Sequence, residues 1–249
     1  MKNRKKIQTA LWFIVMVLGS AVAKAGTDTG GVMLSGTRLI YDGCRNVAGL
    51  TVTNSAAHDV WLMRFWISPY EDKPETKKVK HIAPPFVVTP PLYRLDPDGT
   101  VQLRINQMKD DLPTDRESVF YLNSLAIPPK KGEKNFRESV QGGLQFAVNT
   151  RIKMFYRPAA ISNRQALKAA PGKLSVAVMD KTMLISNPTP YFITLSQLAI
   201  NGVPVQTELD TMVPPFGEIR LPVATGHGSL SYSTIDDRGM TTPSLKKIF

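Results

Sequence analysis

Short segments in which apolar and polar residues alternate recur along this chain of 249 residues, and no long segment has the period of an amphipathic helix. Alternation with a period of two is typical of a β-strand with one buried face. Seven such segments, separated by turn residues, occupy the first part of the chain: 32–41, 50–54, 60–67, 86–95, 101–105, 118–125 and 144–155. Seven short strands over about 130 residues favour an immunoglobulin-like β-sandwich.

The strand pattern restarts after Pro158, and 158–160 is interpreted as a short hinge because proline resists continuing a central strand. Five further strand-like segments follow: 174–178, 183–186, 191–200, 218–223 and 228–235. Asn201-Gly202, between apolar flanks, is a strong hairpin signal. Only 164–170 suggests a short turn of helix. The sequence therefore predicts an all-β chain of two β-sandwich domains, 26–157 and 158–249.

The first 25 residues have the organisation of a secretory signal peptide. Basic residues open the chain at positions 2–6, and small residues stand at Ala23 and Ala25, the two positions that a signal peptidase reads. The alternative is a membrane anchor, but the apolar core at 10–22 is short for a span of about 20 residues. We therefore expect cleavage after Ala25 and export from the cytoplasm.

Charge and cysteine content narrow the function further. The net charge is 31 − 20 = +11, and loss of the five signal-peptide cations, with no acids, leaves 11 − 5 = +6. No basic run alternates with exposed aromatic residues, so together with export this moderate charge argues against nucleic-acid binding. Cys44 is the single cysteine and cannot form an internal disulfide. Stability must come from core burial, for which the roughly 224 mature residues suffice.

The sequence contains no pattern that would support catalysis. His58, His81 and His227 are far apart and lack metal-ligand spacing. Neither a Gly-x-Ser-x-Gly elbow nor a glycine-rich phosphate loop is present. The adjacent Asp236 and Asp237 would point to opposite faces of a strand, where each is expected to pair with a cation. We therefore expect neither enzymatic activity nor a metal or cofactor.

The segment at 144–158 combines a β-strand pattern with strong positive charge. Three alternating apolar side chains share one face of its first half: Leu144, Phe146 and Val148. Three cations occupy its second half: Arg151, Lys153 and Arg157. Such a strand could hold an extended peptide by its backbone, its side chains and a terminal carboxylate. In β proteins at large, however, alternating apolar residues of this kind are more often core residues.

Several motifs extend this observation along most of the mature chain. In order they are Thr37-Arg38, TPPLYRL at 89–95, DRESVFYLN at 115–123, IPP at 127–129, IKMFYRP at 152–158 and NPTPY at 187–191. Together they resemble the PapD-like chaperones of chaperone–usher pili. The resemblance implies a boomerang of two immunoglobulin-like domains with a cleft between them. It also implies a periplasmic, non-enzymatic chaperone that lends its seventh strand to pilus subunits lacking their last strand, then passes them to an outer-membrane usher.

The resemblance also implies roles for eight residues. Two cleft cations anchor the C-terminal carboxylate of the subunit: Arg38 and Lys153. The donated side chains are Leu144, Phe146 and Val148. An ionic cluster holds the two domains at a fixed angle: Glu117, Arg157 and Asp237. It implies as well that the Thr89–Pro90 peptide is cis.

Two points about these residues stay open at the level of sequence. Asp236 competes with Asp237 as the partner of Arg157. Lys153 lies at the opposite parity to Val148, so that a bulge or a strong twist would have to turn it into the cleft. An exposed donor strand is also an edge-pairing hazard, which predicts that the free chaperone can self-associate.

Two other functions fit the sequence less well than the chaperone. A secreted two-domain adhesin or pilus subunit would carry an N-terminal extension of alternating apolar residues, and 27–31 is too short and too polar for that. A periplasmic hydrolase would need nucleophile and base motifs, which are missing. The chaperone is the interpretation we adopt, with pilus subunits and an usher as its partners.

Overall fold

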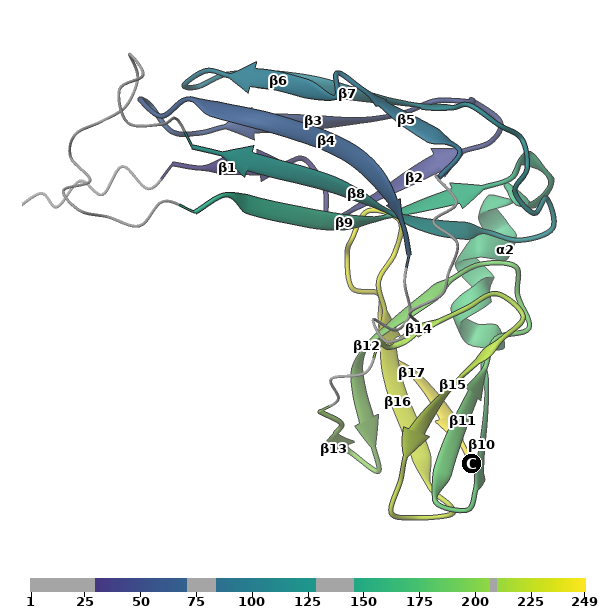
Figure 1. Cartoon of the computed structure of the whole chain (residues 1–249). Coiled ribbons are helices and arrows are strands. Elements are labelled where there is room, and N and C mark those ends of the chain that lie inside the picture. Colours follow the sequence, from purple (N-terminus) through teal and green to yellow (C-terminus); the bar gives the residue numbers. More distant parts are fainter. Residues whose placement is uncertain (1–29, 71–83, 129–145, 207–209) are drawn as a thin grey trace, which may run out of the picture.

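The computed structural model describes residues 30–70, 84–128, 146–206 and 210–249. It contains two β-rich bodies that meet at a steep angle, so the chain has the outline of a boomerang (Figure 1). Strands up to β9 build the first body, and strands from β10 onward build the second. The predicted all-β fold with two domains is confirmed. The predicted signal peptide, 1–25, lies outside the described residues.

The first domain is a sandwich of two sheets. One sheet has the strand order β1 (Val32–Leu34), β3 (Ala48–Asn54), β7 (Thr100–Gln107) and β5 (Phe86–Thr89). The other has the order β2 (Arg38–Asp42), β9 (Val148–Arg157), β8 (Ser118–Ile127), β4 (Trp61–Pro69) and β6 (Leu92–Leu95). Neighbouring strands are antiparallel except β2 and β9, which pair in parallel.

Alternate residues of these strands enclose one apolar core, because successive side chains of a strand point to opposite faces. Members contributed by β4, β7 and β9 include Met63, Phe65, Leu103, Ile105, Ile152 and Met154. Tyr41 packs against Phe86 and Tyr156 at the end of this core, with ring centroids 5.1 Å and 5.8 Å apart. One face of β9 is therefore committed to the core along its second half.

Two segments predicted as single strands each supply two strands to different sheets. Segment 32–41 is divided into β1 and β2, and segment 86–95 is divided into β5 and β6. The second division falls at the Thr89–Pro90 peptide, which is cis as predicted. Both predictions of a continuous strand are wrong, because the alternation of apolar residues persists when a strand crosses from one sheet to the other.

The second domain is a smaller sandwich. One sheet has the order β10 (Ser175–Met179), β11 (Thr182–Ser186) and β15 (Glu218–Pro222). The other has the order β13 (Val203–Pro204), β12 (Ile193–Ile200), β16 (Ser229–Thr234) and β17 (Leu245–Ile248), with β14 (Met212–Val213) also paired to β12. The predicted hairpin at Asn201-Gly202 is confirmed, since Ile200 pairs with Val203 around it.

Three short helical elements connect the domains: η1 (Ala159–Ile161), α2 (Arg164–Ala169) and η2 (Ala170–Lys173). The helical turn predicted near 164–170 is thus confirmed. Asn163 caps α2, because its side-chain oxygen accepts a hydrogen bond from the Ala166 N–H at 2.9 Å. Within the described ranges, no helix is long and apolar enough to span a membrane.

Candidate functional site

The parallel pairing of β2 with β9 places Arg38 directly opposite Lys153. Ile152 and Met154 point into the core, so Lys153 projects from the opposite face, toward the second domain. The register between β9 and β8 is continuous from Val148 to Tyr156. A bulge is therefore not needed to turn Lys153 into the cleft, because the cleft lies on the face of the sheet opposite the core.

Arg38 is half-buried at the junction of the two domains. Its Nη1 donates a hydrogen bond to the carbonyl oxygen of Ile235 at 3.3 Å, and its guanidinium lies 5.6 Å from the ring centroid of Phe155. Burial lowers the pKa of Arg38, although the charge of Asp237 opposes the shift. Within the described residues its buried Nε has no hydrogen-bond partner. Arg38 is therefore not fully hydrogen-bonded by the described part of the chain.

A cavity of about 580 Å³ lies between the two domains. Arg38 and Arg157 line it from the first domain, and Asp236 and Asp237 line it from the second. Lys153 is not part of this lining, because its side chain contacts the segment that leads into β14. The structure therefore brings Arg38 and Lys153 together in the sheet and places only Arg38 on the cavity wall.

Lys153 is paired with a carboxylate from the second domain. Its Nζ lies 3.2 Å from both Oδ1 and Oδ2 of Asp210. The Tyr70 hydroxyl donates to Asp210 Oδ2, and the Met212 N–H donates to Oδ1 at 3.1 Å. Burial would raise the pKa of Asp210, but the Tyr70 hydrogen bond and the Lys153 charge lower it below its usual value. Sequence reasoning missed Asp210, which belongs to no strand pattern or motif.

The structure brings Glu117, Arg157 and Asp237 together across the domain junction. Arg157 Nε donates to Glu117 Oε1 at 2.7 Å, and its Nη1 and Nη2 donate to the two oxygens of Asp237 at 2.8 Å and 2.9 Å. The second oxygen of Glu117 accepts a hydrogen bond from the Phe192 N–H of the second domain at 2.8 Å. Asp236 instead accepts backbone hydrogen bonds within its own turn. The partner of Arg157 is therefore Asp237.

The cluster is buried unevenly. The side chains of Glu117 and Arg157 are 2% and 10% exposed, whereas that of Asp237 is 39% exposed. Burial raises the pKa of Glu117, against the opposing charge of Arg157. Burial would lower the pKa of Arg157, but its hydrogen bonds and charge interactions with Asp237 and Glu117 raise it. The buried pair depends on complete pairing, because an unpaired buried charge is strongly destabilising.

The predicted donor residues lie at the start of β9. Leu144 is outside the described residues. Phe146 is 66% exposed and Val148 is 54% exposed. Val148 lies on the same face of β9 as Ile152, which is only 7% exposed. The apolar face of β9 is therefore buried in the core at Ile152 and exposed at the start of the strand.

The first half of β9 also has an edge that no other described strand covers. The pairing with β2 begins at Lys153, whereas the pairing with β8 extends back to Val148. Among the described strands, residues 148–152 of β9 therefore pair on one side only. Exposed apolar side chains and an open backbone edge coincide in this stretch.

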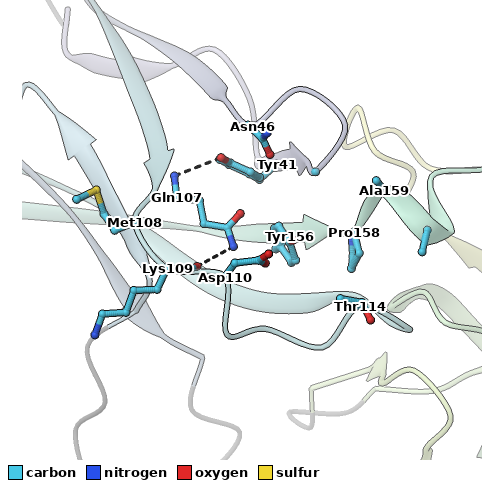
Figure 2. Close-up of a pocket in the computed structure, with 12 residues that line it drawn as sticks. Tyr41, Asn46, Gln107, Met108, Lys109, Asp110, Thr114, Tyr156, Pro158 and Ala159 are labelled. Atoms are coloured by element: carbon cyan, nitrogen blue, oxygen red, sulfur yellow. Dashed lines mark hydrogen bonds between the residues drawn. The ribbon is translucent and has the colours of Figure 1, made fainter.

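A second pocket, of about 560 Å³, lies where the first domain meets the connecting segment (Figure 2). In its wall the Gln107 N–H donates to the Tyr41 hydroxyl at 3.2 Å, and Gln107 Nε2 donates to the carbonyl oxygen of Lys109 at 2.8 Å. None of the described residues predicted for the site lines this pocket. It is therefore separate from the interdomain cavity that carries Arg38.

Comparison with known families resolves the class of protein. Residues 31–162 match the family described as the pili and flagellar-assembly chaperone, PapD N-terminal domain. Residues 169–245 match the PapD C-terminal domain of pili assembly chaperones. The chain belongs to the PapD-like pilus-assembly chaperones. The family is non-enzymatic, and this chaperone is accordingly not an enzyme.

Relatives of the chaperone match it over most of their length. It is 38% identical over 221 residues to the probable fimbrial chaperone LpfB of Escherichia coli O157:H7, and the match covers 88% of each chain. It is 34% identical to the periplasmic chaperone SfaE, with a TM-score of 0.66 over 87% of this chain and 98% of that chain. A chain from the Salmonella enterica complex of SafA pilin with the SafB chaperone has 27% identity and a TM-score of 0.72, covering 88% and 96%. The similarity to other chaperones thus extends over both domains of the chain.

Proposed function

We propose that this chaperone is exported to the periplasm, completes pilus subunits by donating the first half of β9 and passes them to an outer-membrane usher. The coincidence of an open edge at 148–152 with the exposed Phe146 and Val148 carries this proposal. The similarity to the periplasmic chaperone SfaE and to a pilin–chaperone complex supports it. The predicted signal peptide at 1–25 supplies the route of export.

Donation of a strand satisfies two needs of an incomplete β-sandwich. A subunit that lacks a strand exposes unpaired backbone groups, which are costly to leave dry. The free edge of β9 can pair with them, while alternate side chains fill the pockets of the subunit. Leu144, Phe146 and Val148 would contribute about 1.5–3 kcal/mol each before the costs of association are subtracted.

Arg38 and Lys153 are proposed to bind the C-terminal carboxylate of the subunit. They are adjacent across the β2–β9 pairing and lie on the face turned toward the second domain. An arginine can form two parallel hydrogen bonds with a carboxylate, whereas a lysine acts as a point charge. Together they would set the register in which the donated strand meets the subunit.

The cluster of Glu117, Arg157 and Asp237 is proposed to hold the domain angle. Arg157 belongs to β9, and its two carboxylate partners come from different domains. A division of the mature chain into domains 26–157 and 158–249 fits this geometry, since β9 ends at Arg157 and η1 begins at Ala159. The ionic cluster would therefore fix how the second domain sits beside the cleft cations Arg38 and Lys153 of the first.

Co-expression with the subunits encoded beside the chaperone tests the proposal. A one-to-one complex of chaperone and subunit in the periplasmic fraction is expected, with a mature chaperone that begins at Gly26. Subunits that accumulate equally well without the chaperone would contradict it. Recovery of the protein on assembled pili would instead identify it as a subunit or adhesin, the alternative interpretation. Self-association of the free chaperone should disappear in the complex, because self-association and subunit binding would use the same strand.

A further inference from the structure

The Asp210 carboxylate is partly exposed to water and is paired with Lys153. Both of its oxygens lie 3.2 Å from Lys153 Nζ. It comes from the second domain, while Lys153 and Tyr70 belong to the first, so this contact crosses the cleft. The Tyr70 hydroxyl and the Met212 N–H also donate to its two oxygens.

The two cleft cations differ in what they bind. Lys153 is paired with a carboxylate, whereas Arg38 donates to the carbonyl oxygen of Ile235. The buried Nε of Arg38 has no partner among the described residues. Lys153 therefore already binds the chemical group that the proposed function brings to it. A subunit carboxylate cannot form a close ion pair at Lys153 without replacing Asp210 or crowding a second negative charge against it.

We propose that Asp210 is an internal substitute for the C-terminal carboxylate of the subunit. It occupies Lys153 in the free chaperone and is displaced when the subunit carboxylate binds. This inference rests on the carboxylate-anchoring function proposed above. Asp210 thereby acts as a specificity-determining residue, because only a ligand with its own free carboxylate can replace it and leave Lys153 paired.

The exposure of the pair suits such an exchange. The side chains of Lys153 and Asp210 are 23% and 37% exposed, and ion pairs with this access to water are weak. The lowered pKa of Asp210 keeps it ionised at neutral pH, so it competes as a full negative charge. After displacement the Tyr70 hydroxyl and the Met212 N–H can still hold its carboxylate at the side of the cleft. Lys153 thus remains ion-paired in both the free and the bound state.

The test is the substitution Asp210→Asn, which removes the charge but keeps an acceptor for the Tyr70 hydroxyl. The probe is a synthetic peptide of the C-terminal strand of the subunit encoded beside the chaperone, made with a free carboxylate or as an amide. Asp210→Asn should bind the free-carboxylate peptide about fivefold more tightly than the wild type, with little change for the amide. Glu218→Gln is the matched control, because it removes the same charge from an exposed pair with Arg220.

A second measurement tests whether Asp210 protects Lys153 in the free chaperone. Acetylation of Lys153 by limiting acetic anhydride, followed by mass spectrometry, should be faster in Asp210→Asn than in the wild type or Glu218→Gln. An unchanged labelling rate, or unchanged or weaker binding of the free-carboxylate peptide, would overturn the role of Asp210. If those outcomes are found but Lys153→Ala still abolishes the preference for the free carboxylate, the anchoring function stands and only the role of Asp210 fails. If Lys153→Ala retains that preference, Lys153 is not part of the anchor and its exchange with Asp210 fails as well, whereas retention in Arg38→Ala too would overturn the anchoring function.

Discussion

Val148 and Lys153 lie on the same strand, β9, but project from its opposite faces. The pairing of β9 with β8 has no register break between them, and their positions differ by an odd number of residues. Val148 continues the face that carries Ile152 and Met154, whereas Lys153 faces the second domain. Strand donation and carboxylate binding are therefore assigned to separate faces, and substitutions can test them independently.

Phe146→Glu tests donation. Phe146 is 66% exposed, so the variant should melt within a few degrees of the wild type, since surface substitutions usually change stability by less than about 0.5 kcal/mol. Capture of subunits should be lost, because a charge would enter an apolar pocket of the subunit. Met179→Glu, at a residue 63% exposed in the second domain, is the control and should retain capture. A large drop in the melting temperature of Phe146→Glu would mean that Phe146 is a core residue.

Neutralising the buried carboxylate of the ionic cluster should lower the free energy of unfolding more than neutralising the exposed one. Glu117→Gln leaves Arg157 without its buried partner and should lower the free energy of unfolding by about 3 kcal/mol. Asp237→Asn should lower it by about 1 kcal/mol, since Asp237 is partly exposed. Urea unfolding measures both, and small-angle scattering should show a broader range of domain angles in each. Equal losses for the two variants would contradict the uneven burial of the cluster.

The alternation of apolar residues located most strands, because a half-buried strand must repeat every two residues. It could not locate β13 and β14, which have two residues each, or the points at which 32–41 and 86–95 change sheets. It also missed β17, whose sequence LKKI does not alternate. These elements are defined by pairing with distant segments, which a local pattern does not contain.

In the candidate site, too, contacts between distant residues could not be predicted from a local pattern. Arg157 and Asp237 are 80 residues apart, and their contact depends on how the two domains meet. Only the resemblance to a family supplied that pair, and Asp236 remained a competing candidate. Asp210 had no signal at all, because a single acidic residue outside a motif becomes informative only when a cation lies beside it in space. The parity of Lys153 suggested a bulge, which the position of the cleft on the outer face makes unnecessary.

Gly239 is expected to be required for the close approach of the two domains. Its φ is +81°, and an added Cβ would overlap Oγ1 of Thr37 in the first domain. Gly202 has the same φ with no atom near its Cβ position, so Gly202→Ala measures the backbone strain alone, about 1 kcal/mol. Gly239→Ala should cost about 1–3 kcal/mol more in thermal unfolding. Adding Thr37→Ala should restore part of that loss, and no restoration would mean that the domains do not touch there.

The Lys153–Asp210 pair should make a contribution to stability that disappears in acid. The pKa of Asp210 is lowered in the folded chain, so its stabilisation is present above the unfolded value near pH 4 and is lost as the pH falls through the folded value. At pH 7 the wild type should exceed Asp210→Asn by about 0.5–1 kcal/mol, a figure reduced by solvent screening. Urea unfolding at several pH values should show this difference shrinking below pH 4. A difference that grows in acid would contradict the pairing.

Binding of a subunit carboxylate by Arg38 and Lys153 is tested most directly by the preference of the chaperone for a free C-terminus. Calorimetry with the C-terminal peptide of the subunit, as free acid and as amide, gives this preference as a ratio of two dissociation constants. The wild type should favour the acid by about 30-fold or more, because truncating one partner of a buried charge pair costs about 2–5 kcal/mol. Arg38→Ala and Lys153→Ala should each reduce the ratio toward one, while Arg104→Ala, an exposed cation on the other sheet, should leave it unchanged. A ratio that stays at the wild-type value in both cleft variants would contradict the assignment of the anchor.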